Sequence, residues 1–390
     1  MTGDNMRVGS RRWFLCATAL AIVCLLSVVL AAGQAGPAQP PSDRVPMSEE
    51  VFKNVALLRG IPVDTFFEAM GMFASAMGND CTFCHATGAY FDKSVFAQST
   101  PRIVRARQMI VMMNAINKQY FGGEPRVTCF TCHSGNQSPR KEPDLAIQYG
   151  PPVEDPNAIE FPADTRVTAD QVFAKYIQAI GGAERLAGLS SLVGKGTYSG
   201  FDTAFEKVPV EVFGKAPAQQ AVIVHMFGGD SVRTFDGRNG WMAGPDTPVP
   251  LLTLTGGNLD RARLEATLLF PAGIRQAFSE WRVGRTAIDD REVQIVQGLT
   301  AGQAMANFYF DEAGLLVRLV RWTRTPVGLV PTQIDYSDFR DVAGVKVPFR
   351  RTVSQTYMQM TIELTEVQPN VQIDASRFAR PAPGATRRMG

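Results

Sequence analysis

The 390-residue chain is poor in the side chains that usually carry chemistry, with 6 cysteines and 3 histidines. No cysteine follows Cys132, and the only histidine beyond His133 is His225, which lies in a stretch with strand character. The second half therefore cannot build a disulfide framework, and it shows neither a catalytic triad nor a cluster of metal ligands. Because lone polar residues in strands are more often structural than functional, we expect His225 to serve the sheet.

The chain also lacks an excess of charge of one sign. Lysine and arginine number 39, aspartate and glutamate number 37, and the formal net charge is +2. A domain that binds nucleic acid by its backbone usually carries a basic patch or stripe, and the sequence shows none. We therefore expect no nucleic-acid partner.

An uncharged apolar run at 13–32 follows Arg11 and Arg12. Basic residues before such a run are typical of an export signal, and the run is also long enough to span a bilayer. We predict that residues 1–35 are a cleaved signal peptide or a retained anchor that associates the chain with a membrane. A Pro-, Ala- and Gly-rich linker follows at 36–46.

Four of the cysteines and two of the histidines fall in two copies of one motif, Cys-x-x-Cys-His, at 81–85 and 129–133. This pattern is the attachment signal for c-type haem, in which the two thiols add to the haem vinyl groups and the histidine binds the iron. Zinc sites or redox dithiols also use Cys-x-x-Cys pairs, but they do not need a histidine directly after the second cysteine, twice. We predict two covalently attached haem c groups, held by Cys81, Cys84, Cys129 and Cys132, with His85 and His133 as axial iron ligands.

A stretch with helical periodicity and several methionines precedes each motif. Apolar residues at spacings of three and four predict helices over 62–77 and 102–120. Methionine often supplies the second axial ligand of haem iron in electron carriers, although a methionine on an apolar helix face is more often core packing. Met77 is too near the first motif to reach over a haem. Spacing does not choose among the others, which are Met70, Met72, Met109, Met112 and Met113.

The stretches 51–58, 105–110, 114–117 and 127–133, together with Met70, resemble the cytochrome c subunit of photosynthetic reaction centres. The similarity covers roughly residues 47–135. It implies an electron carrier in photosynthetic electron transport in which a methionine on the helix before each motif binds the iron, namely Met70 and Met109. It also implies redox partner proteins on the quinol or reaction-centre side. Purple-bacterial members of that family carry four haems, whereas this chain has two motifs.

Prolines crowd residues 139–165, which we interpret as a linker, and a new pattern begins after it. Thr168 is placed to cap a helix that runs to Ile180, and a second helical stretch falls near 259–278. Alternating apolar residues between turns predict strands, which together suggest one long antiparallel meander with two helices. The predicted strands are 208–213, 221–227, 232–235, 240–243, 307–310, 315–322, 333–336, 346–354 and 358–367.

The stretches 334–340, 345–349 and 373–378 resemble the periplasmic lipoprotein carriers of the outer-membrane sorting pathway. This resemblance implies a curved antiparallel sheet, a half-barrel, packed over a helix. Its concave face would hold a lipid or acyl ligand.

These observations predict an α+β multidomain chain. Its parts are a signal or membrane helix (1–35), a linker (36–46), an α-helical dihaem cytochrome c domain (47–138), a Pro-rich linker (139–165), a lipoprotein-carrier-like β domain (166–382) and a tail (383–390). The expected function is one-electron transfer at the periplasmic side of the inner membrane, without enzymatic activity. Two alternatives stay open. One is a periplasmic lipid- or ligand-binding protein whose haems are redox sensors, and the other is a haem enzyme with one open iron position.

Overall fold

The computed structural model describes residues 44–90, 92–150, 159, 167–245, 247 and 249–384. The predicted export segment at 1–35, the first part of the linker after it and most of the 139–165 linker lie outside these residues. Within the described part of the chain, no helix is both long and apolar enough to cross a membrane. Residues from Val45 onward cluster as one unit.

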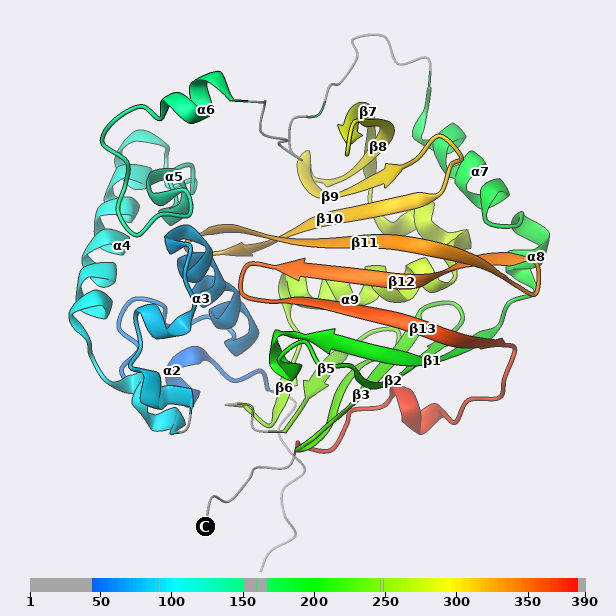
Figure 1. The fold of residues 1–390 in the computed structure, drawn as a ribbon, viewed down its shortest axis with the longest axis horizontal. Helices are drawn as coiled ribbons and strands as arrows, with labels where there is room; N and C mark the ends of the chain where they lie inside the picture. The colour runs from blue at the N-terminus through cyan, green and yellow to red at the C-terminus, as the bar shows by residue number, and fades with distance from the viewer. Residues whose placement is uncertain are drawn as a thin grey trace, which may run out of the picture. The chain divides into compact units, whose positions relative to one another are not determined.

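The second half forms an open antiparallel sheet of 13 strands in the order β6-β5-β4-β3-β2-β1-β13-β12-β11-β10-β9-β8-β7 (Figure 1). The strands are β1 Ser191–Gly200, β2 Val208–Lys215, β3 Gln219–Met226, β4 Gly229–Phe235, β5 Gly240–Ala243, β6 Leu251–Thr253, β7 Glu280–Ile288, β8 Arg291–Thr300, β9 Gln303–Phe310, β10 Leu316–Thr325, β11 Gly328–Val342, β12 Val345–Gln355 and β13 Gln359–Pro369. The predicted antiparallel sheet is confirmed, and β1, β6, β7 and β8 are additions to it.

The prediction of one continuous meander is wrong. Strands β1 to β6 and strands β7 to β13 are two separate meanders, joined where β1 pairs with β13. The chain passes from the outer edge strand β6 to the opposite edge strand β7 through α9 (Gly256–Leu269) and the 3-10 helix η5 (Pro271–Ala277). The apolar side chains of α9 pack on one face of the sheet. The connection from β6 to β7 therefore crosses that face from one edge of the sheet to the other.

The helices of the second half cover one face of the sheet. They are α7 (Ala169–Ala179), α8 (Ala183–Ala187), α9 and η5, and the single-turn η4 (Phe201–Thr203) and η6 (Ala375–Phe378) lie in loops. The two predicted helices are confirmed, and the Thr168 side chain caps α7 by accepting from Gln171 N. Helices α7, α8, α9 and η5 share one core with a row of paired strand residues, Val296, Phe308, Leu319, Ile334 and Val353.

Helices dominate the first half, and both of its predicted long helices are confirmed. They are α3 (Val63–Met77) and α4 (Pro101–Tyr120), with the short α2 (Ser48–Val51), η1 (Cys81–Phe83), η2 (Thr87–Tyr90), η3 (Lys93–Ala97), α5 (Cys129–His133) and α6 (Leu145–Tyr149) around them. Helix α6 lies inside the stretch interpreted as a linker. Thr100 caps α4 by accepting from Ile103 N, and Pro101 occupies its first turn, where its missing N–H costs nothing.

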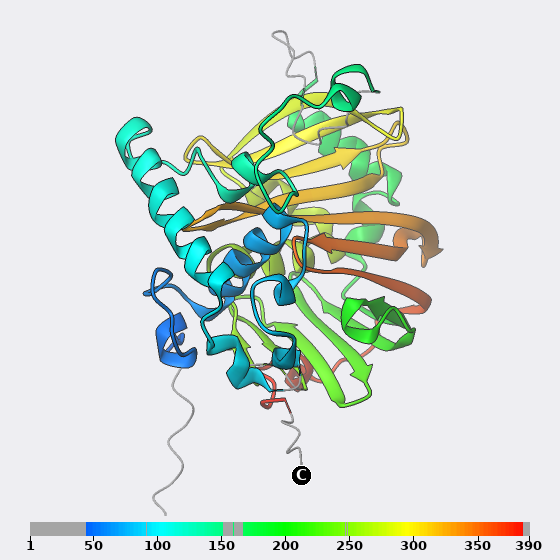
Figure 2. The same cartoon turned by 60° about the vertical axis from the view of Figure 1, so that its left-hand side comes forward.

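Helix α3 joins the two halves (Figures 1 and 2). Its Ala69 and Met72 are buried in one cluster with Val327 and Val330, which lie at the β10–β11 hairpin. The two valines and Ala69 have no exposed surface. The helix before the first Cys-x-x-Cys-His motif is therefore packed directly on the sheet.

Candidate functional site

The first motif begins directly after α3. Gly78 ends the helix in the left-handed conformation, at a φ of 61°, which suits glycine at this position. The Asp80 side chain then accepts from Thr82 N at 2.8 Å and starts the 3-10 turn that carries Cys81. These two caps turn the chain sharply, so that the motif follows the helix with only a few residues between them.

His85 is held in a half-buried site beside Phe96, with the two rings 5.0 Å apart and edge to face. Its Nδ1 atom is buried without a hydrogen-bond partner. Burial lowers the pKa of His85, so the ring is neutral near pH 7. A neutral imidazole is the form that binds iron.

The second motif forms the short helix α5, which Thr128 and Thr131 start through a capping box. His133 Nδ1 lies 3.1 Å from the backbone oxygen of Asn136. Since a carbonyl can only accept, this bond requires the proton on Nδ1 and leaves Nε2 free as a lone-pair donor. Metal-binding histidines are commonly oriented by such a bond from the ring nitrogen that does not touch the metal.

The four motif cysteines are free thiols in the structure. Burial raises the pKa of Cys81 and Cys84, and it raises the pKa of Cys129 to about 11. Within the described ranges, no three His, Cys, Asp or Glu side chains converge to hold a metal ion. The zinc alternative therefore gains no support from the described residues.

The second motif lies beside the end of α3, the helix that leads into the first motif. Gly135, just after the second motif, donates its N–H to the carbonyl of Ala76 in the last turn of α3 at 3.0 Å. Gly78 packs so closely on the Gly135 carbonyl that a Cβ at position 78 would come within 2.2 Å of it. The end of the first helix therefore contacts the exit of the second motif.

The methionines of α3 and α4 differ in their surroundings. Met72 and Met113 are buried in the cluster with Val327 and Val330, so core packing accounts for them. Met70 and Met109, the two residues that the resemblance points to, are half-buried. Met112 is 47% exposed. Met70 also packs against the edge of this cluster, so the structure separates the buried Met72 and Met113 from the partly accessible Met70 and Met109 and the exposed Met112.

Helix α4 presents an apolar surface that the described residues leave uncovered. Of its 20 residues, only Ile110, Met113 and Asn117 are buried. Large apolar side chains on α4 and around the second motif are exposed, namely Val104, Val111, Met112, Tyr120, Phe121 and Phe130. Of these, Val104 and Val111 are seven residues apart and share a face of α4, where they could contact an apolar group. The residues around the motifs therefore fit a large apolar group such as haem.

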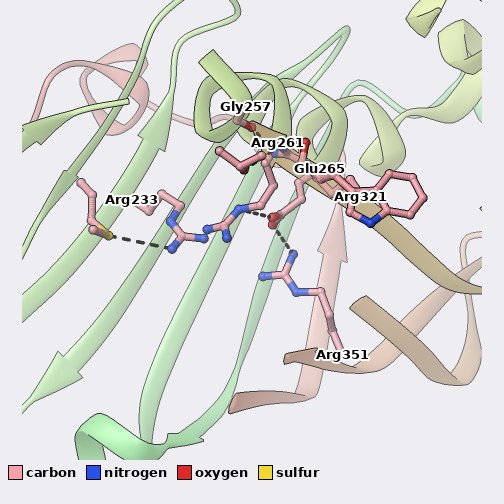
Figure 3. A network of polar contacts seen from close by, with 9 residues as sticks. Arg233, Gly257, Arg261, Glu265, Arg321 and Arg351 are labelled. Carbon is pink, nitrogen blue, oxygen red and sulfur yellow. Dashed lines mark hydrogen bonds and ion pairs between the residues drawn. The ribbon is translucent and has the colours of Figure 1, made fainter. Parts of the chain in front are cut away.

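A second polar site, which the sequence analysis missed, lies between α3, α9 and the sheet. Figure 3 shows Arg233 (β4), Arg261 and Glu265 (α9), Arg321 (β10) and Arg351 (β12) converging. Arg261 Nε and Arg351 Nη1 each lie 3.2 Å from the Glu265 carboxylate, and Arg321 donates to the Gly257 carbonyl. We call these five residues the arginine cluster.

Burial and the neighbouring charges together set the pKa values in this cluster. Burial raises the pKa of Glu265, but Arg351, Arg261 and the other arginines outweigh it, and the net shift is downward. Burial lowers the pKa of Arg321 to about 10. Both groups therefore stay charged near pH 7.

Two carboxylates of α3 approach this cluster from the helical half. Asp64 Oδ1 accepts from the Thr255 hydroxyl and Oδ2 from the Thr255 N–H, both at 2.6 Å. Glu68 lies within the field of Arg261 and Arg321, although burial raises its pKa and its Oε2 has no hydrogen-bond partner. Each side chain is only 3% exposed. The sequence did carry a signal here, because Asp64 and Glu68, like Arg261 and Glu265, are charged residues four apart within otherwise apolar helical patterns.

Comparison with known proteins points to the same segment as the motifs. Residues 27–146 match the family described as photosynthetic reaction centre cytochrome C subunit. The chain is 32% identical over 113 residues to a photosynthetic reaction center cytochrome c subunit of Rubrivivax gelatinosus, covering 28% of this chain and 29% of the relative. A subunit of the same name from Roseobacter denitrificans is 27% identical over 108 residues, covering 23% of this chain and 29% of the relative.

Among solved structures, the chain is similar to a LolA superfamily protein from Nitrosomonas europaea. The TM-score is 0.36 and the identity 13%, covering 55% of this chain and 98% of that one. A putative outer membrane lipoprotein-sorting protein domain from Vibrio parahaemolyticus gives a TM-score of 0.33 and an identity of 8%, covering 50% of this chain and 93% of that one. The expected resemblance to the reaction-centre cytochrome subunit is confirmed, and the chain spans less than a third of the length of those curated relatives.

Proposed function

We propose that this protein is a one-electron carrier with two covalently attached haem c groups. Cys81 and Cys84 would tether the first group and Cys129 and Cys132 the second, through thioether bonds. His85 and His133 would bind iron on one side, and Met70 and Met109 on the other. Haem c, when bound, supplies an iron centre that takes up and gives back a single electron.

The observation that carries this proposal is the contact between the two motif regions. The backbone bond from Gly135 to Ala76 joins the exit of the second motif to the helix of the first, so two groups held there would be neighbours. His133 supports it, because the Asn136 carbonyl holds the ring with Nε2 available. The exposed apolar residues of α4 support it as well, since a tethered haem would cover them.

We infer a location at the periplasmic side of the inner membrane, because c-type haem is attached outside the cytoplasm and residues 1–35 have the pattern of an export signal or anchor. The partners would be redox proteins on the quinol or reaction-centre side. The name of the similar subunits supports this class of partner.

A second candidate function is suggested by a cavity in the second half. Its volume is about 100 Å³, and apolar residues of the sheet, α7 and α9 line it, with Glu265, Arg351 and Tyr336 among its polar lining residues. Small-molecule sites usually measure about 300–1,000 Å³, so a lipid or acyl ligand would require the cavity to open. The haems would then act as redox sensors.

Intact mass and absorption spectra of the protein, made together with a haem-attachment system, test the main proposal. We expect a mass increase of two haem groups and the spectrum of six-coordinate low-spin iron at both sites. A mass without haem, or with zinc, would refute the carrier. One five-coordinate iron that binds carbon monoxide would favour the haem enzyme, and tight binding of a fluorescent fatty acid by a haem-free protein would favour the second candidate.

A further inference from the structure

The acidic residues of α3 lie on the side of the helix that faces the sheet. Asp64, Glu68, Gly71 and Met72 are all buried, and they recur at the three- and four-residue spacing of one helical face. Met70 comes two positions after Glu68, which turns it roughly 200° around the helix axis. The helix therefore presents its carboxylates to the sheet and Met70 to the other side.

Asp64 makes its contacts with the beginning of α9, about 190 residues further along the chain. It accepts from the N–H and the hydroxyl of Thr255, the residue that precedes α9, and Asn258 Nδ2 lies 3.4 Å from the same carboxylate. The Thr255 hydroxyl makes no capping bond to its own helix. Asp64 thus fixes Thr255 at the start of α9, and its carboxyl group, whose pKa burial raises, lies near the positive end of the helix dipole.

Glu68, one turn further along α3, extends the contact into the arginine cluster. Its charge is attracted by Arg261 and by Arg321, and both of these guanidinium groups are buried. Glu68 Oε2 and Arg261 Nη1 are both buried without a hydrogen-bond partner. Glu68 therefore interacts with the arginine cluster through charge alone, without a hydrogen bond to it.

Charged contacts of this kind specify position more strictly than apolar ones do. Apolar side chains such as Met72 and Val327 tolerate a shift of the helix at modest cost, because they can repack. A shift that separates Asp64 from Thr255, or Glu68 from the arginine cluster, leaves a buried charge without partners, which is far more costly. The helix therefore has one favoured place on the sheet.

We propose that the second half of the chain positions the first iron site: Asp64 and Glu68, held by Thr255 and the arginine cluster, determine where α3 presents Met70. This inference rests on the proposed function, in which Met70 binds the first iron. Asp64, Glu68 and Thr255 are positioning residues, since none of them would touch the haem. The methionine proposed for the second iron is on α4, which makes none of these contacts.

Thr255→Val tests the inference, because it removes the hydroxyl donor to Asp64 from a residue far in sequence from both motifs. The measurements are the near-infrared methionine–iron band of the oxidised dihaem protein, the reduction potential of each haem and the unfolding temperature. Thr255→Ser keeps the hydroxyl and should behave as the unchanged protein. Thr300→Val, at an exposed threonine of β8, is the matched control. We expect Thr255→Val to shift the band and the potential of one haem clearly more than those of the other.

Two results would overturn the inference. One is an equal change at both haems, which indicates general loosening of the fold. The other is a Thr255→Val protein in which neither haem changes, together with a Met70→Ala protein that loses half of the band. Met70 would then be an iron ligand whose position does not depend on the sheet. If Met70→Ala leaves the band intact, the ligand assignment of the proposed function has failed, and the inference fails with it.

Discussion

At the scale of single residues, Met70 and Met109 are the side chains on which the carrier proposal depends most. Met70→Ala and Met109→Ala should each abolish about half of the methionine–iron band and lower the potential of one haem, because methionine ligation raises it. Each reduced variant should bind one carbon monoxide. Met112→Ala is a matched control, because Met112 lies on the same helix as Met109 and is 47% exposed. Loss of the band in Met112→Ala instead would place the ligand on another face of α4.

Glu265 is the residue whose charge holds the arginine cluster together. Removing one partner of a buried ion pair costs about 3–5 kcal/mol, and we expect a loss of this order for Glu265→Gln at pH 7. The folded-state pKa of Glu265 is lowered, so its stabilisation is complete above the unfolded-state value, roughly 4.3. This stabilisation is lost as the pH falls through the lower folded-state pKa.

Urea unfolding of the unchanged protein and of Glu265→Gln between pH 3 and pH 7 measures this difference, which should shrink below a pH of about 4. Glu280→Gln, at an exposed glutamate of β7, is the control and should cost little at any pH. A difference that stays constant down to the lowest pH would mean that the lost stability comes from packing and not from the charge of Glu265.

At the scale of elements, α3 approaches the β12–β13 turn at Gly71. A Cβ at position 71 would lie 2.4 Å from Thr356 Oγ1 and 2.7 Å from Tyr357 Cδ1. Alanine favours a helix over glycine by about 1 kcal/mol, but such overpacking typically costs about 1–3 kcal/mol. Gly71→Ala should therefore destabilise the protein in urea unfolding. Adding Thr356→Ala should recover part of the loss, because Thr356 Oγ1 makes no hydrogen bond. A stabilising Gly71→Ala would show that this contact is looser than the structure has it.

Local patterns predicted most of the elements, and long-range pairing decided the rest. The helices α3 and α4 and the strands β2 to β5 and β9 to β13 follow from periodicity and caps, which act within a few residues. Strand β1 begins Ser191-Leu192-Val193-Gly194-Lys195-Gly196, and its three glycines, Gly194, Gly196 and Gly200, hide the strand pattern. It is stabilised by pairing with β13, far away in the sequence.

The residues of the candidate sites also divide into those that a local pattern predicts and those that only the fold brings together. The Cys-x-x-Cys-His motifs are contiguous, so the sequence alone predicted their cysteines and histidines. The arginine cluster draws on β4, α9, β10 and β12, and its members meet only through the topology of the sheet. Neither the periodicity of the sequence nor its charge could have predicted the contact between Asp64 and Thr255, because no local rule connects residues on separate elements.

At the scale of the whole molecule, the sheet should fold without the helical half, but less stably. All 13 strands lie between Ser191 and Pro369, so residues 165–390 contain the complete sheet and its main core. The fragment loses α3, which exposes Val327 and Val330 and leaves the start of α9 without Asp64. Circular dichroism and urea unfolding of the fragment should show a β-rich protein that binds no haem and unfolds at lower urea than the full chain. A fragment as stable as the full chain would mean that α3 contributes nothing to the sheet, and an unfolded one would mean that the halves share a single folding core.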